Sequence, residues 1–167
     1  PFGLAYMEVL KIVLTTLLFF KYLEKLELTN FVKIIGSLLF AFGGWMILGT
    51  SGWYVFSTQV FYFALIIYAL ENYLKSKNWI LLTIAVALSS CFDLISSIQY
   101  LFFSVAYLVF RSFENDKKQL VSIIKKASSI IAIFLLGIGL AGIYTVNYFY
   151  FVFDIRLNNL KMGEGWA

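Results

Sequence analysis

The sequence feature that most constrains this fold is the stretch Trp79–Phe110, which contains one charged residue, Asp93, and is otherwise uncharged. As a single helix these residues would reach ~48 Å, too long for a hydrocarbon core of ~30 Å. The stretch must therefore cross a membrane twice or enter it as a re-entrant hairpin, with Asp93 at the turn. Because 62% of the residues are hydrophobic and mean hydropathy is +0.88, the sequence predicts an integral membrane protein.

Apolar segments separated by short connections predict an all-α, polytopic transmembrane helical bundle with about six spans. The segments are 4–20, 31–49, 54–71, 79–91, 95–110 and 127–151. A chain of 167 residues has room for these spans and for no separate soluble domain. We expect a single transmembrane domain over residues 1–167, and we expect it to be an internal piece of a longer multi-pass protein.

The charge of the connections alternates along the chain. The connections 21–33, 72–78 and 111–126 carry ten of the thirteen Lys and Arg residues, and those near 50–53 and 92–94 carry none. The positive-inside rule places the basic connections in the cytoplasm. Residue 1, Asp93 and the C-terminal segment are then predicted to be extracytoplasmic.

Several classes of function are excluded by what the sequence lacks. Cys91 is the only cysteine and there is no histidine, so the chain holds no internal disulfide, no His-based catalytic triad and no Cys/His metal cluster. The lysines follow membrane orientation, so the net charge of +4 does not predict nucleic-acid binding.

Glu8 and Lys11 form a charged pair inside the first apolar segment, three residues apart on one helix face. Such a pair either neutralises itself, with Lys11 reaching toward the interface, or offers Lys11 as a cation for a lipid-linked phosphate. Both interpretations stay open, and Glu8 and Lys11 are candidate substrate-binding residues.

The segment 43–59 is rich in glycine, tryptophan and neutral polar residues, including Trp45, Trp53 and Gln59. Aromatic faces next to hydrogen-bonding groups suit a sugar, and the same residues suit an ordinary interfacial turn. Trp45, Trp53 and Gln59 are therefore candidate substrate-binding residues.

Two further features offer charge on the predicted outer side. Asp93, with Ser96 and Gln99 nearby, is either a general base or a solvated turn carboxylate. Arg156 and Lys161 are cations on the predicted outer side, so Arg156 is a candidate for binding an anion, or part of a larger external domain. Small residues at Gly137 and Ala141 indicate close helix packing.

Three stretches together resemble the bacterial YfhO family of multi-pass membrane proteins. They are a Lys-bearing span leading into "FKYLEKL", a span ending in "FAFGGW", and an aromatic span closing on "LENYLKSKNW". The family is similar to GT-C type glycosyltransferases, which use a polyprenyl-phosphate sugar on the outer face of the membrane. The resemblance implies a bacterial cell-membrane location and a cell-wall polymer, such as teichoic acid, as acceptor.

The resemblance matches only Lys11 to a family position and implies no cofactor beyond the polyprenyl-phosphate sugar donor. The family's catalytic carboxylate lies in an external loop that would precede Pro1, so we expect the base outside this chain, with Asp93 as the candidate within it. The alternatives are a transporter or flippase for a lipid or amphipathic solute and a non-catalytic membrane scaffold. The expected partners are membrane lipid, a lipid-linked sugar and the polymer acceptor.

Overall fold

The chain folds into α-helices in the computed structural model, which describes residues 2–44, 46–47, 54–113, 120–147 and 150. No β-strand occurs among these residues, so the predicted all-α class is confirmed. The labelled helices are α1 Phe2–Lys25, α2 Asn30–Ala41, α4 Tyr54–Ser76, α5 Trp79–Phe92, α6 Leu94–Phe113 and α7 Leu120–Leu140.

Four helices of the described chain are long and apolar enough to cross a membrane. They contain the segments Gly3–Lys25, Val55–Ser76, Leu94–Ser112 and Ile123–Leu140. Two further apolar helices, α2 and α5, have 12 and 14 residues and would rise only ~18 and ~21 Å. The described residues therefore form four helices that could span a membrane, as in a multi-pass membrane protein. Two of the six segments that the sequence predicts as spans form the shorter helices α2 and α5.

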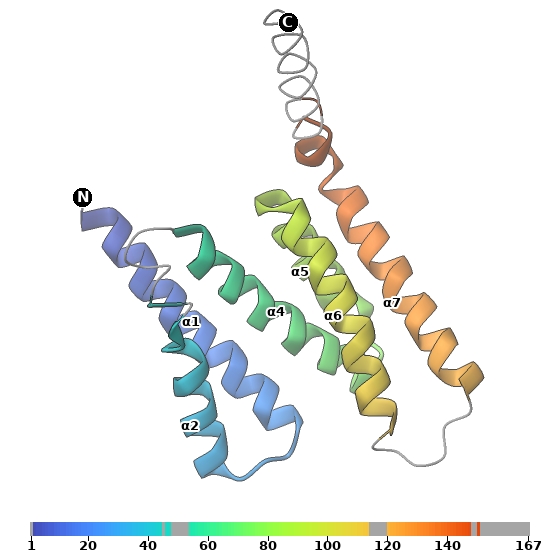
Figure 1. Ribbon diagram of the computed structural model, residues 1–167, viewed down its shortest axis with the longest axis horizontal. Helices are drawn as coiled ribbons and strands as arrows, with labels where there is room; N and C mark the ends of the chain where they lie inside the picture. The colour runs from blue at the N-terminus through green and yellow to red at the C-terminus, as the bar shows by residue number, and fades with distance from the viewer. Residues whose placement is uncertain (1, 45, 48–53, 114–119, 148–149, 151–167) are drawn as a thin grey trace, which may run out of the picture.

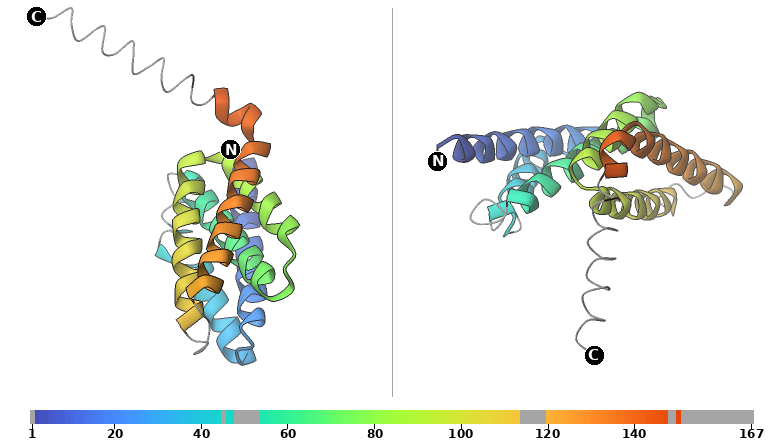
Figure 2. Two further views of the ribbon diagram at one scale, coloured as in Figure 1. Left: turned by 90° about the vertical axis from the view of Figure 1, so that its right-hand side faces the viewer. Right: turned by 90° about the horizontal axis from the view of Figure 1, so that it is seen from above.

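The helices form a bundle in which α4 connects two groups (Figure 1, Figure 2). On one side α1 packs against α2 and α4, and on the other α5 packs against α4, α6 and α7. Helices α1 and α4 are neighbours although α2 lies between them in sequence, so side chains of α1 can reach those of α4.

The main core lies where α4, α5, α6 and α7 meet. Its fully buried side chains include Leu70 of α4, Leu82 and Val86 of α5, and Phe134 of α7. Gly137 of α7 lies against Val86, since a Cβ added there would be 2.7 Å from Val86 Cγ1. Close helix approach at Gly137, which the sequence predicts, is confirmed.

Large apolar side chains cover much of the outer surface. Leu4, Phe31, Leu39, Phe102 and Ile143 are each about 70% exposed or more. Exposing this much apolar surface to water would be unfavourable, whereas the acyl chains of a lipid bilayer would cover it.

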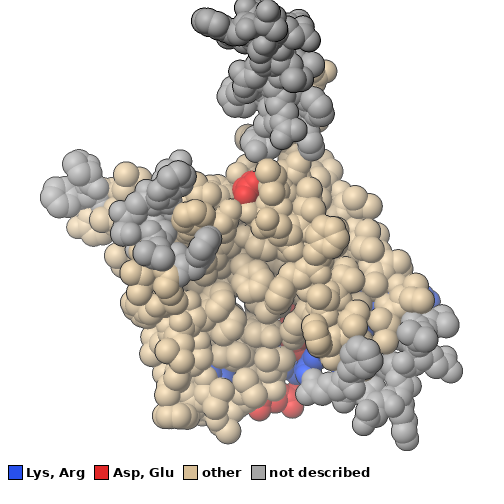
Figure 3. Space-filling model, in the orientation of Figure 1, with Lys and Arg blue, Asp and Glu red and all other residues tan. Residues whose placement is uncertain are grey.

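The α1–α2 connection, the α4–α5 connection, the end of α6 and the start of α7 lie at one end of the bundle, which we call the basic end (Figure 1). Figure 3 shows on the face in view that blue and red atoms gather mostly toward that end, while the sides of the molecule are tan. The opposite end holds the turn between α5 and α6, and we call it the Asp93 end. This separation is the one that the positive-inside rule needs.

The first basic connection is fixed to the second by an ion pair. Glu27 has a left-handed backbone with φ 61° and accepts a hydrogen bond from Lys75 Nζ at 2.9 Å. That hydrogen bond holds the pKa of the Glu27 carboxyl below its usual value. The pair therefore links the end of α1 to the end of α4.

The predicted break inside Trp79–Phe110 is confirmed, because α5 ends at Phe92 and α6 begins at Leu94. The segment 31–49 differs from one continuous span. Here α2 ends at Ala41, and the Met46 and Ile47 amides both donate to Gly43 O. Adjacent glycines at 43 and 44 favour this break, because glycine disfavours the helix interior.

The last predicted span, 127–151, begins earlier in the structure. Helix α7 starts at Leu120 and includes Lys125 and Lys126 in its early turns. It ends at Leu140, and a turn at Ala141 leads into helical residues 142–147. Long lysine side chains can lie at a membrane interface while their backbone is helical, so charge did not mark the helix boundary.

Candidate functional site

Three polar residues meet at the Asp93 end, and we call them the Asp93 cluster: Gln59 of α4 with Asp93 and Ser96 at the α5–α6 turn. Gln59 Nε2 donates to Ser96 Oγ at 2.8 Å and to Asp93 Oδ2 at 3.3 Å. Ser96 Oγ also donates to Asp93 Oδ2. The cluster thus joins α4 to the α5–α6 turn through side chains 34 and 37 residues apart.

Asp93 has a structural role as the residue that caps both helices of the hairpin. Its backbone amide donates to Ser89 O at 2.8 Å, which ends α5. Its carboxylate Oδ1 accepts the Ile95 amide at 3.0 Å at the start of α6. A carboxylate in this position satisfies a free helix amide and faces the positive end of the helix dipole. The geometry therefore gives Asp93 a capping role at the turn, where the residue is partly exposed.

A cavity of about 530 Å³ borders the Asp93 cluster. Gln59 and Ser96 contribute to its wall, and Asp93 does not. Among the described residues, the lining comes from the end of α2 and the residues just after it, from α4 and from α6: Leu39, Phe40, Gly43, Gly44, Met46, Gln59, Val60, Phe63, Ser96, Gln99 and Tyr100. We call this cavity the α2–α4–α6 pocket.

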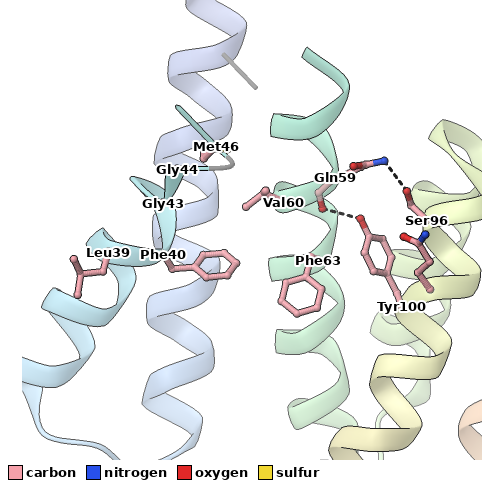
Figure 4. Close-up of a pocket in the computed structure, with 11 residues that line it drawn as sticks. Leu39, Phe40, Gly43, Gly44, Met46, Gln59, Val60, Phe63, Ser96 and Tyr100 are labelled. Atoms are coloured by element: carbon pink, nitrogen blue, oxygen red, sulfur yellow. Dashed lines mark hydrogen bonds between the residues drawn. The ribbon is translucent and has the colours of Figure 1, made fainter. Parts of the chain in front are cut away.

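The pocket has an apolar side and a polar edge (Figure 4). Phe40 and Phe63 project from α2 and α4, while Gln59 and Ser96 meet on the opposite side of α4. Tyr100 OH donates to Gln59 O at 2.8 Å and so fixes its ring beside that edge. No Lys, Arg, Asp or Glu lines the pocket among the described residues, so its polar edge is neutral.

The aromatic side of the pocket continues as a series of rings across the bundle. Phe40 stacks on Phe19 of α1 at 4.0 Å between centroids, and it lies 6.2 Å from Phe63. Phe63 in turn lies 4.8 Å from Phe103 of α6. These contacts connect four helices, α1, α2, α4 and α6, and sequence spacing alone could not have found them.

Glu8 and Lys11 form the predicted pair in α1. Lys11 Nζ lies 2.6 Å from Glu8 Oε1, and both side chains are mostly buried, with exposed fractions of 20% and 12%. Lys11 Nζ also donates to Ser57 Oγ of α4 at 3.4 Å. Glu8 Oε2 is buried and has no hydrogen-bond partner among the residues that the structure describes. The pair is neutralised in itself, and it leaves one carboxylate oxygen unsatisfied.

The predicted candidates therefore fall into separate groups. The structure brings Gln59 and Asp93 together, and it places Lys11 with Glu8 against Ser57. Ser57 and Gln59 differ by only ~3 Å along the axis of α4, so both groups lie at a similar depth. Trp45, Trp53 and Arg156 lie outside the described residues.

A buried carboxylate near the basic end was missed by the sequence reasoning. Glu71 of α4 is 1% exposed; it accepts a hydrogen bond from Tyr107 OH at 2.8 Å and pairs with Arg111 Nη2 at 3.4 Å. Tyr22 OH of α1 donates to Tyr107 OH at 3.3 Å. The i, i+4 spacing of Tyr107 and Arg111 was the available signal, because it places both side chains on one face of α6.

No group of three or more metal-binding side chains occurs among the described residues. Comparison with known proteins found no match among protein-family models, curated proteins or solved structures. The resemblance to the YfhO family thus stays a prediction. The geometry of the site has to carry the functional argument.

Proposed function

We propose that this chain is part of a membrane glycosyltransferase that moves a sugar from a polyprenyl-phosphate donor to an extracytoplasmic cell-wall polymer such as teichoic acid. The observation that carries the proposal is the α2–α4–α6 pocket, with an apolar wall and a neutral polar edge. The sugar of the donor occupies that pocket, and the resemblance to the YfhO family supplies the reaction type.

The pocket suits one sugar attached to a lipid. Its volume of about 530 Å³ lies within the range typical of small-molecule sites. The rings of Phe40, Phe63 and Tyr100 match the C–H faces of a sugar, while Gln59 and Ser96 offer hydrogen bonds to its hydroxyl groups. Exposed apolar side chains on the neighbouring helix faces suit the isoprenoid chain.

Lys11 is the cation that we assign to the donor phosphate. It lies at the depth of the pocket's polar edge, and Glu8 fixes its ammonium group by the 2.6 Å contact. In the transfer, the bond between the sugar's anomeric carbon and the phosphate oxygen breaks and a bond to the acceptor oxygen forms. A fixed ammonium near the departing phosphate would stabilise the negative charge that develops there.

Asp93 acts in this proposal as a positioning residue. Its two carboxylate oxygens accept hydrogen bonds from the Ile95 amide, from Ser96 and from Gln59. It therefore orients the Gln59 amide at the pocket edge. The base that removes the acceptor's proton is not assigned to Asp93.

Photo-crosslinking tests whether the pocket holds the donor. The protein in lipid nanodiscs is irradiated with polyprenyl-phosphate glucose or N-acetylglucosamine that carries a photoactivatable group on the sugar. We expect label in α4 and α6, and loss of about fivefold in Gln59→Leu, the effect of one lost hydrogen bond. Asn72→Leu, also on α4 but outside the pocket, is the matched control and should label like wild type.

Two outcomes contradict the proposal. Equal labelling of wild type and Gln59→Leu would show that the pocket does not bind the sugar. The second outcome compares two unlabelled competitors at equal concentration, the sugar-bearing donor and polyprenyl phosphate without a sugar. If both abolish photo-labelling equally, the chain recognises only the lipid phosphate.

A further inference from the structure

Two cavities lie next to each other at the basic end, away from the α2–α4–α6 pocket. One has about 190 Å³ and is lined by residues of α4, α6 and α7, and the other has about 330 Å³ and extends to Trp79 at the start of α5. Leu74 and Lys126 line both. We call the two together the basic-end cavity.

More cations than carboxylates line the basic-end cavity among the described residues, although Lys75 is paired with Glu27 and Arg111 with Glu71. Its smaller part is lined by Lys75, Arg111 and Lys126 with one carboxylate, Glu71. Its larger part is lined by Lys77 and Lys126 and by no carboxylate among the described residues. Cations from three helices thus surround one space, although none of these helices is strongly basic alone.

The positions of these cations are set by the fold. Arg111 is held by Glu71, whose side chain is 2% exposed, so the guanidinium is anchored where the cavity begins. Lys126 is half-buried on α7. The backbone of Lys77 is left-handed with φ 58°, and its amide donates to Tyr73 O, which ends α4. The backbones that carry Arg111, Lys126 and Lys77 are therefore held in place at the cavity.

The rest of the lining suits a lipid better than a free ion. Leu74, Leu108 and Ile133 give apolar walls, and Ser129 Oγ lies 2.7 Å from Tyr73 OH at the polar side. Trp79 at the mouth is half exposed, as is typical of tryptophans at a membrane interface. A phosphate with an attached glycerol and acyl chain would meet cations and apolar walls together.

We propose that the basic-end cavity binds the phosphate group of an anionic phospholipid from the cytoplasmic leaflet. That leaflet is the one in which the positive-inside rule places the basic end, and basic pockets between transmembrane helices are a known way to hold such headgroups. The site is independent of the proposed glycosyltransferase function, because it shares no lining residue with the α2–α4–α6 pocket.

The test uses the full chain in phosphatidylcholine nanodiscs that contain a small fraction of photoactivatable phosphatidylglycerol. We expect crosslinks in α4 and α7 of the wild type. The double variant Lys77→Gln/Lys126→Gln should lose about fivefold in labelling for each charge removed. Lys77→Arg/Lys126→Arg should keep most labelling, which separates loss of charge from loss of fold.

The matched control is Lys21→Gln/Lys25→Gln, which removes two charges from the basic end of α1 outside the cavity. We expect labelling close to wild type. An equal loss in the control and the cavity variant would overturn the proposal, because it would show only general attraction to the surface. Removal of the wild-type label by millimolar inorganic phosphate would also overturn it in favour of a soluble phosphate ligand.

Discussion

Gln59 of α4 donates its side-chain amide to Ser96 of α6 at 2.8 Å, across 37 residues of sequence. This contact joins the polar edge of the α2–α4–α6 pocket to the helix cap formed by Asp93. The pocket and the hairpin turn are therefore coupled, and a substitution at the turn should shift the position of the Gln59 side chain at the pocket edge.

Replacing Asp93 separates its capping role from its contact with Gln59. Asp93→Ala removes the acceptor for the Ile95 amide and should lower the free energy of unfolding by about 1 kcal/mol. Asp93→Asn keeps a capping oxygen but replaces the oxygen that accepts from Ser96 and Gln59 with an NH2 group, so it should destabilise the protein less than Asp93→Ala does. Thermal unfolding in detergent measures the difference. Equal destabilisation by both substitutions would contradict the capping role, and a stable Asp93→Asn that labels with the donor like wild type would contradict the positioning role.

Glu71 and Arg111 should be energetically coupled. Glu71→Gln or Arg111→Gln alone should each cost about 1–3 kcal/mol in unfolding free energy, because a buried charged contact is lost. The double variant should cost less than the sum of the two. Additive costs would show that the pair contributes nothing as a pair. Lys21→Gln, which breaks an exposed pair with Glu24, is the control and should change stability little.

Gly137 should tolerate no side chain. A Cβ there would lie 2.7 Å from Val86 Cγ1 and 3.1 Å from Thr83 O, so Gly137→Ala should separate α7 from α5 and lower stability. Gly139→Ala is the control, because no described atom beyond its chain neighbours and its own helix backbone lies within 4 Å of its Cβ position. Adding Val86→Ala should recover part of the loss. Equal melting temperatures of the two glycine variants would contradict this packing.

The orientation can be tested with cysteines at the two ends. Cys91 is free and exposed, so Cys91→Ser provides the background. Asn147→Cys at the Asp93 end should react with a membrane-impermeant maleimide in intact bacterial cells, and Ser76→Cys at the basic end should not. The reverse pattern of reactivity would contradict the predicted topology and show that the basic end faces outward.

The helix break at Asp93 was predictable because a length argument forced it. Residues 79–110 cannot cross once, and Asp93 was the only charge available for the turn. The early end of α2 was not predicted, because residues 31–49 are apolar enough for one span, and a Gly43–Gly44 pair breaks a helix only when tertiary packing favours it.

The candidate site was predicted in part. Gln59 and Asp93 were chosen separately, and only the fold shows that they touch. Glu71 was overlooked because it lies four residues before Lys75 and looks like half of a helix-surface pair. In the structure Lys75 pairs with Glu27 instead, and Glu71 faces inward to Arg111, forty residues away.

Transfer of sugar is the most direct test of the proposed function. Sealed membrane vesicles that contain the longer protein to which we expect this chain to belong are incubated with radiolabelled polyprenyl-phosphate sugar and cell-wall polymer. Label attached covalently to the polymer is then measured. The account predicts that the polymer is labelled in a protein-dependent way and that Lys11→Ala lowers labelling more than it lowers the amount of protein. Label that crosses the membrane but stays attached to the lipid would contradict the account and indicate a transporter. Label that neither moves to the polymer nor crosses the membrane would also contradict it and indicate a non-catalytic scaffold.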